Sequence, residues 1–348
     1  MSFKTKFGVA AALALSVSAT AVCAEEMKIA FIDPLSGPFA STGSNGLHQF
    51  EFAADKLVNE KGGILGGTTF KVDGFDNKAS PQESLIQLQV AIDQGYKVIV
   101  QGNSSGVAHA LTDAIEKHNK RNPDSRVLFL NYAAVDPALT NDDCNFWHFR
   151  FDANADIKMD VLTDVIKDNQ DIKKVYIIGQ DYSFGKAVSA AANSMLKEKR
   201  PDIEVVGDEL HPIGKVKDFT PYARKIVSSG ADAVITGNWG ADMLGLGKAL
   251  VANGFSGPVY TYYAAGSGIT AAFGEAGKGV IRLVAEGQLN PPPNDQVVEY
   301  YKAYKAKYPD GNIDQPRIYN TIGFLSAAIE KAGTADDVVS IGKAMEGM

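Results

Sequence analysis

The chain has 348 residues, 45% of them hydrophobic, and a formal net charge of −7 at neutral pH. This length is enough to build two hydrophobic cores. The acidic balance, without any basic block along the sequence, argues against nucleic acid as a partner.

The first 24 residues have the layout of a secretory signal peptide. Lys4 and Lys6 precede an apolar run that ends at the small-residue sequence Val22-Cys23-Ala24. We therefore predict a signal peptide over residues 1–24, cleavage after Ala24 and a mature protein in the periplasm. The apolar run is too short for a membrane span, and no later segment has the length and apolarity of one.

The two cysteines refine this prediction. Cys23 allows a lipoprotein interpretation, but Val22 stands where lipoprotein signals usually carry a small residue, so we favour a soluble periplasmic protein. Removal of the leader leaves Cys144 alone, which rules out an intramolecular disulfide in the mature chain. We expect Cys144 to be a small buried residue.

Short apolar runs alternate with amphipathic stretches in the first half of the chain. Gly62-Gly63 and Gly66-Gly67 fit a turn after the first helix and do not open a helix after a strand, so they are not a dinucleotide-binding loop. The expected strands are Met27–Ile32, Lys97–Val100, Val127–Leu130 and Trp147–Phe151, and the expected helices are Ser44–Lys61, Pro81–Gln94 and Ser105–Lys120.

The same rhythm continues in the second half. The alternation predicts parallel sheets with helices on both faces, and right-handed crossovers make this a doubly wound α/β fold. The expected strands are Val175–Ile178, Glu204–Val206, Ala233–Thr236, Val259–Thr261 and Val280–Leu289, and the expected helices are Asp156–Asp168, Phe184–Lys197, Pro221–Ser229 and Ala241–Asn253.

There are too many of these units for one sheet, so we predict two doubly wound α/β lobes joined by a hinge. One crossing falls around Cys144–Asn154, and a second ends at Asn290-Pro291-Pro292-Pro293, where three prolines fix an extended link. The predicted first lobe comprises residues 25–152 and 286–348, and the second comprises residues 153–285.

No complete catalytic or metal-binding constellation is visible in the sequence. It contains no Walker loop and no H-E-x-x-H, and none of its five histidines has a second His at ligand spacing. We therefore expect no catalytic residue, no metal and no cofactor. Strand-end carboxylates could do acid–base chemistry, but without a visible partner we expect them to cap the helix or turn that follows. They are Asp33, Asp76, Asp181 and Asp232.

Ligands of open parallel sheets bind at the carboxyl ends of the strands, so the residues after each strand define a candidate site. Ser104 and Ser105 fall at a helix start, where hydroxyls and backbone N–H groups suit a carboxylate, although ordinary N-capping is an alternative. Phe184, Trp239 and Tyr263 could clamp an apolar or aromatic tail, although Trp239 could instead be a core residue. The full candidate set is Thr42, Asn103, Ser104, Ser105, Ala133, Ala134, Tyr182, Phe184, Trp239, Tyr263 and Arg317.

Several longer motifs resemble the periplasmic leucine/isoleucine/valine-binding proteins, which serve branched-chain amino acid ABC transporters. They cover nearly all of the mature chain in the expected order, and they are IDPLSGPFASTG, VNEKGGILGG, the serine pair, DPALT and KDFTPYARKI. The resemblance implies a type I periplasmic binding protein of the Venus flytrap kind. Its two lobes would close on one small solute and deliver it to an ABC permease in the inner membrane.

The resemblance also implies roles for individual residues. Ser105, with Ser104 beside it, matches the serine that holds the ligand carboxylate. Ala134 matches a backbone alanine of the family site. Val135 stands where the family has a threonine whose hydroxyl also contacts the ligand.

The second-lobe positions depart further from the family. Phe184 and Trp239 match tyrosines, and Tyr263 matches the glutamate that binds the ligand ammonium. Arg317 matches an aromatic position, with a solvated helix residue as the alternative. Because a buried ammonium without its carboxylate costs several kcal/mol, we predict a branched or aromatic carboxylate that lacks the α-amino group.

Two other functions are consistent with an exported α/β protein. An exported hydrolase would need a nucleophile–base pair or a metal cluster, and neither is visible. An amide- or urea-sensing receptor of the same superfamily would differ in partner rather than in fold. Family members usually continue past a helix like Asp336–Met345 into a third crossing and closing strands, so an end at Met348 implies a shortened or an incomplete chain.

Overall fold

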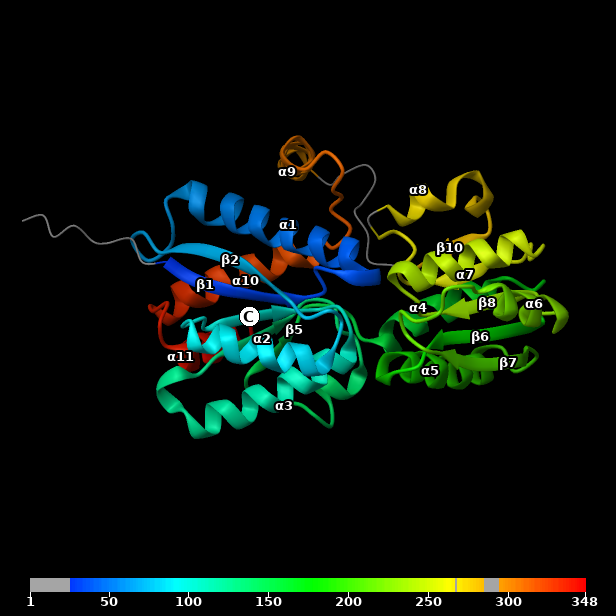
Figure 1. The fold of residues 1–348 in the computed structure, drawn as a ribbon, viewed down its shortest axis with the longest axis horizontal. Helices are drawn as coiled ribbons and strands as arrows, with labels where there is room; N and C mark the ends of the chain where they lie inside the picture. The colour runs from blue at the N-terminus through cyan, green and yellow to red at the C-terminus, as the bar shows by residue number, and fades with distance from the viewer. Residues whose placement is uncertain (1–25, 267, 285–293) are drawn as a thin grey trace, which may run out of the picture.

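The computed structural model describes residues 26–266, 268–284 and 294–348, which form two five-stranded parallel sheets lying side by side (Figure 1). The predicted signal peptide and the Asn290–Pro293 link lie outside the described residues. The first sheet contains β1 (Glu26–Asp33), β2 (Thr69–Asp76), β3 (Val98–Gln101), β4 (Leu128–Asn131) and β5 (His148–Arg150), in the order β2-β1-β3-β4-β5. We call the part of the protein built on this sheet the first lobe.

Helices cover both faces of the first sheet because its strands are apolar on both sides. In β1, Ile29 and Phe31 pack on one face, and Ala30 and Ile32 pack on the other. One face carries α1 (Ala40–Leu57), α10 (Arg317–Ala332) and α11 (Val338–Met345), and the other carries α2 (Pro81–Asp93) and α3 (Ser105–Arg121). Helix α9 (Asp295–Lys307) packs through Tyr304 on Phe52 of α1.

The second lobe repeats this arrangement. Its sheet contains β6 (Lys174–Gln180), β7 (Glu204–His211), β8 (Ala233–Thr236), β9 (Val259–Thr261) and β10 (Ile281–Leu283), in the order β10-β9-β8-β6-β7. One face carries α4 (Ala155–Asp168) and α5 (Ser183–Lys199), and the other carries α6 (Thr220–Ser228), α7 (Gly240–Ala252) and α8 (Ile269–Phe273). The structure thus confirms the predicted α/β class with two doubly wound lobes.

The chain passes from the first lobe to the second between β5 and α4, and α10 and α11 lie back in the first lobe (Figure 1). The predicted boundaries at residues 152/153 and 285/286 stay predictions, and the second of them falls among residues that the structure does not describe. Within the described ranges, no helix has the length and apolarity needed to cross a membrane.

Most predicted elements are present, but β2, α9 and α10 were not predicted, and the expectation for Cys144 failed. Strand β2 was missed because Lys71 and Asp73 break its apolar pattern, as is common in an edge strand, and β2 pairs only with β1. Cys144 is exposed, so the prediction of a small buried residue was wrong. The reason is local: Cys144 follows the turn after the short 3-10 helix Pro137–Thr140, and that turn lies on the surface.

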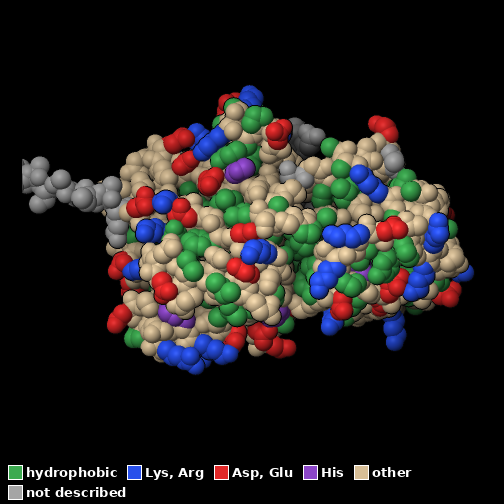
Figure 2. Space-filling model, viewed as in Figure 1, with side chains coloured by type: hydrophobic (Ala, Val, Ile, Leu, Met, Phe, Trp, Pro, Cys, Tyr) green, Lys and Arg blue, Asp and Glu red, His purple; other side chains and the backbone are tan. Residues whose placement is uncertain are grey.

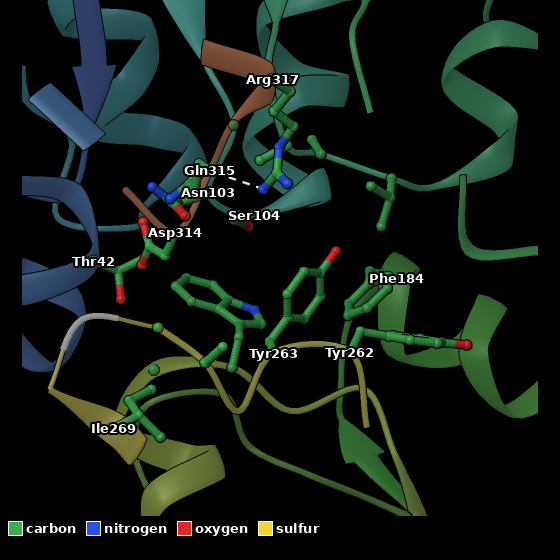
Figure 3. A pocket seen from close by; sticks show the side chains of 18 of the residues that line it. Thr42, Asn103, Ser104, Phe184, Tyr262, Tyr263, Ile269, Asp314, Gln315 and Arg317 are labelled. Carbon is green, nitrogen blue, oxygen red and sulfur yellow. Dashed lines mark hydrogen bonds between the residues drawn. The ribbon is translucent and has the colours of Figure 1, made fainter. Parts of the chain in front are cut away.

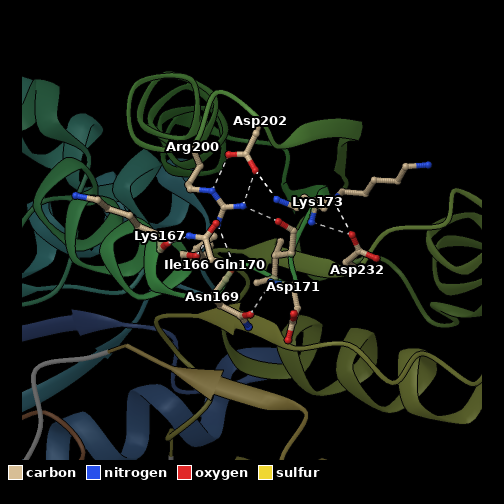
Figure 4. Close-up of polar contacts among 11 residues, drawn as sticks. Ile166, Lys167, Asn169, Gln170, Asp171, Lys173, Arg200, Asp202 and Asp232 are labelled. Carbon is tan, nitrogen blue, oxygen red and sulfur yellow. Dashed lines mark hydrogen bonds and ion pairs between the residues drawn. The ribbon is translucent and has the colours of Figure 1, made fainter.

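Arg200 fixes the C-terminal end of α4 (Figure 4). Its guanidinium pairs with both oxygens of Asp202, at 2.7 and 2.9 Å, and donates to the backbone carbonyls of Ile166, Asn169 and Ile172. Carbonyls at a helix end lack partners within the helix, so one side chain satisfies the end of α4 and ties it to the strand that follows.

Acidic and basic side chains are interspersed on the face shown in Figure 2.

Close strand–helix packing at Gly185 gives a stability prediction. A Cβ at this position would lie 1.8 Å from the carbonyl oxygen of Gln180, the last residue of β6. Because backbone cannot yield as a side chain can, we expect Gly185→Ala to lower the free energy of unfolding by about 2 kcal/mol or more. The measurement is chemical denaturation of the purified protein.

Gly323→Ala is the matched control for this prediction. Gly323 is interior to α10 and a Cβ there would meet nothing within 4 Å, so alanine should stabilise the protein by roughly 0.5–1 kcal/mol. Equal stabilities for the two variants would contradict the packing argument.

Candidate binding site

A cavity of about 320 Å³ lies between the two lobes. Its walls come from residues that follow β1, β3 and β4 in the first lobe and β6, β8 and β9 in the second, which is where the carboxyl ends of parallel strands place a ligand. All eleven predicted site residues line this one cavity: Thr42, Asn103, Ser104, Ser105, Ala133, Ala134, Tyr182, Phe184, Trp239, Tyr263 and Arg317. Figure 3 shows part of this lining.

The start of α3 forms the polar wall on the first lobe. Ser104 has a φ of 87°, an uncommon value for a residue other than glycine, and its side chain makes no capping bond. Ordinary N-capping is therefore not the role of this hydroxyl. Ser105 is buried, and its hydroxyl oxygen accepts from the Asp136 N–H at 3.3 Å. The Val107 N–H donates to the Ser104 carbonyl at 3.1 Å, whereas the N–H groups of Ser105 and Gly106 precede the first carbonyl that the helix offers. This wall can therefore donate to an anion.

Asp33 holds the loop that leads into this helix. Its carboxylate accepts from the N–H groups of Gly102 and Asn103, at 3.2 and 3.0 Å, and from the Tyr132 hydroxyl at 2.5 Å. The expectation that Asp33 caps the following helix was wrong, because these donors come from the loops after β3 and β4. Asp76 accepts the Lys78 N–H in the turn that follows it, as expected. The expectation for Asp232 was wrong, because its carboxylate accepts the N–H groups of Lys173 and Lys174 at the start of β6.

Burial raises the pKa of Asp33 to about 7. The hydrogen bonds from Tyr132, Asn103 and Gly102 favour the carboxylate and lower the pKa, but by less. The side chain is completely buried, so the cost of removing its charge from water outweighs those bonds.

Aromatic side chains form the wall on the second lobe. The Trp239 indole N–H donates to the Tyr182 hydroxyl at 2.9 Å, which orients both rings. Trp239 also contacts Phe39 of the first lobe, with ring centroids 4.1 Å apart. Trp239 is therefore both a cavity residue and part of an apolar contact between the lobes. Phe184 and Tyr263 continue the wall, with their ring centroids 5.9 Å apart.

A buried charged cluster lies at one end of the cavity. Lys158 Nζ lies 2.7 Å from one oxygen of Asp152, and Arg317 Nε lies 3.5 Å from the other. Arg317 is only 8% exposed, so the alternative of a solvated helix residue was wrong. Burial lowers the pKa of Lys158, and the Asp152 carboxylate opposes that shift.

Sequence analysis missed Lys158 and Asp152. A signal for Lys158 was available, because it falls on the apolar face of α4 beside Ala155, Met159 and Leu162, where a solvated lysine would be out of place. No comparable signal marks Asp152, which precedes the helix.

The segment before α10 supplies a further part of the lining that sequence analysis missed. Asp314 Oδ1 accepts from the side-chain amides of Asn45 and Gln49, at 2.8 and 2.9 Å. These bonds tie the segment to α1. In Figure 3, Asp314 lies near Thr42, apart from Tyr263. Its contribution could not be read from the sequence because the segment does not follow a strand.

Comparison with known proteins identifies the family. A sequence profile of the periplasmic binding proteins matches residues 26–348. The chain belongs to the periplasmic binding protein family. A relative from Brucella abortus (strain 2308), Leu/Ile/Val-binding protein homolog 4, is 35% identical over 312 residues, which is 87% of this chain and 72% of the relative.

Solved structures of the periplasmic binding protein fold agree with this assignment. The closed Leu/Ile/Val/Thr/Ala-binding protein from Brucella ovis has a TM-score of 0.76 at 31% identity, covering 92% of this chain and 82% of that one. A solute-binding protein of an ABC transporter from R. palustris, in complex with benzoate, has a TM-score of 0.78 at 19% identity, covering 93% and 86%. At that identity the second similarity concerns the fold alone.

The environment of Asp33 predicts a specific pH dependence. Between about pH 4 and 7 the folded protein holds a proton on Asp33 that the unfolded chain has lost. Binding of this proton therefore stabilises the folded protein at low pH, and that stabilisation is lost as the pH rises towards 7. The difference in unfolding free energy between the native protein and Asp33→Asn should therefore shrink by up to about 1.4 kcal/mol per pH unit over this window, and then level off. Denaturation curves from pH 5 to 8 measure it. A difference that grew with pH would contradict the raised pKa.

Proposed function

We propose that this protein captures a small carboxylate-bearing solute with a branched or aromatic body in the interlobe cavity. The protein acts in the periplasm and delivers the solute, chemically unchanged, to an ABC permease. The observation that supports this most directly is the pairing of walls: the donor-rich start of α3 faces an aromatic wall across one small cavity. A relative is named as a homolog of Leu/Ile/Val-binding proteins, and a solved structure of the same fold contains benzoate.

The two walls select complementary parts of the solute. A carboxylate gains from the N–H groups and the dipole at the start of α3 and from the Ser104 and Ser105 hydroxyls. An apolar body gains from contact with Trp239 and Phe184, which exclude water from the other side of the cavity.

The environment of Tyr263 disfavours an α-amino group. Tyr263 stands where the resemblance implies an acidic residue, and Lys158 Nζ lies 5.7 Å from the centre of its ring. An ammonium placed here meets a phenol and the Lys158–Asp152 ion pair, in which the carboxylate is already paired with a cation. Val135, which replaces a threonine of the family pattern, adds no hydroxyl to the cavity.

Ligand contacts to both lobes would drive closure. The lobes already meet through Phe39 on Trp239 and through the hydrogen bond from Ala155 N–H to the Val135 carbonyl, at 2.8 Å. A solute that touches Ser105 and Trp239 together binds the closed arrangement better than an open one, and this difference in affinity is what shifts the population.

Calorimetric titration of the purified protein with benzoate and with leucine tests the ligand class. We expect benzoate to bind and leucine to bind about a hundredfold more weakly or not at all, because its buried ammonium would cost several kcal/mol. Tight binding of leucine would overturn the proposed preference.

Ser105→Ala tests the position of the carboxylate. Loss of a hydrogen bond to a charged group should weaken binding of benzoate by roughly tenfold or more. Ser228→Ala is the matched control, because Ser228 is an exposed residue at the end of α6. An unchanged affinity of the Ser105→Ala protein would place the carboxylate elsewhere.

A further inference from the structure

The His109 side chain on α3 lies between two carboxylates. Its Nε2 atom lies 3.0 Å from Asp136 Oδ2, and its Nδ1 atom lies 2.9 Å from Asp143 Oδ2. A neutral imidazole has only one N–H and would turn a lone pair toward one of these oxygens, whereas the protonated ring has an N–H for each of them. The hydrogen bond to Asp136 raises the pKa of His109, and burial opposes this shift without cancelling it. Geometry and charge therefore both favour the imidazolium.

Asp136 connects this pair to the solute cavity. It follows Val135, and its backbone N–H donates to the Ser105 hydroxyl at 3.3 Å, so it lies directly behind the wall to which the solute carboxylate is assigned. Only 7% of Asp136 is exposed. Burial acts to raise the pKa of Asp136, but the hydrogen bonds from His109 and from the Ala138 N–H outweigh it, so the pKa is lowered. Asp136 is therefore a buried negative charge close to a site for anions.

A buried carboxylate behind this wall repels an anionic solute unless a cation offsets it. Two groups on β5 also face this region. Arg150 donates to the Asp136 carbonyl at 3.3 Å and keeps its charge, and burial lowers the pKa of His148 to about 4, so that ring stays neutral. On α3 itself, Asp113 is paired with Lys117. Of His109, His148 and Arg150, only His109 changes its charge between neutral and alkaline pH.

We propose that His109 is a positioning residue for the solute carboxylate, and that its proton controls the affinity of the cavity for anions. In its protonated form His109 offsets Asp136 and holds the loop that contacts Ser105. In its neutral form it leaves Asp136 to repel the solute. The proposal rests on the proposed function, because it places the carboxylate at Ser105. It adds a dependence on pH, with weaker binding of the acid in alkaline surroundings.

Calorimetric titration of the native protein and of His109→Gln with benzoate, from about pH 6 to about pH 10, tests the proposal. Glutamine can still donate to Asp136 but carries no charge. At about pH 6 the variant should bind benzoate about tenfold more weakly, because a charge a few ångströms away is worth about one pKa unit or more. As the pH rises through the raised pKa of His109, the native affinity should fall to that of the variant. Asp33 and Cys144 remain in both proteins, so any change in their charge cancels in the comparison.

Two further variants separate the effect of charge from a structural effect. Asp143→Asn removes one of the two carboxylates that raise the pKa of His109, so the pH at which the affinity for benzoate falls should move down. His118→Gln is the matched control, because His118 lies further along the same helix and contacts the Ser125 carbonyl at 2.8 Å. This control should keep the native affinity and the native pH profile.

The outcomes distinguish this proposal from the proposed function. If the native protein and His109→Gln differ in affinity by the same factor at every pH, or if Asp143→Asn leaves the pH profile in place, the role of His109 is overturned and the carboxylate-binding function stands. If benzoate binds neither protein at any pH, the proposed function fails as well. Should His109→Gln not fold, the profiles of the native protein and of Asp143→Asn still decide the question.

Discussion

The cavity depends on one buried carboxylate. Asp33 ends the interior strand β1, and its oxygens accept from the N–H groups of Gly102 and Asn103 and from the hydroxyl of Tyr132. Three loops that follow neighbouring strands are thereby held by one side chain. Because the loop after β3 runs directly into α3, this interaction sets where the donors of the first helical turn point, and with them the polar wall of the cavity.

The second constraint is the contact between lobes. Phe39 reaches from the first lobe into the core cluster of the second, where it packs on Trp239. Trp239 is fixed in turn by its bond to Tyr182. The aromatic wall therefore belongs both to the interface and to the cavity, so a solute that packs against it also stabilises the approach of the lobes. Binding and closure are coupled through the same rings.

The sequence predicted the parts of the site that follow parallel strands, because the rule that ligands bind at the carboxyl ends of strands needs only strand positions. Ser104, Ser105, Phe184 and Trp239 were found in this way. Arg317 came from the resemblance alone, since it opens a helix that the periodicity did not predict. The cluster with Asp152 was missed because buried ion pairs form between residues that no local pattern connects, and Asp314 was missed because its segment lies between two helices.

A crystal structure of the protein with benzoate tests the central claim most directly. The account predicts density for the acid between the lobes, with its carboxylate within hydrogen-bonding distance of the backbone N–H groups and hydroxyls at Ser104 and Ser105, and with its ring against Trp239 and Phe184. Benzoate bound outside this cavity, or bound inside it with its carboxylate turned away from the start of α3, would contradict it.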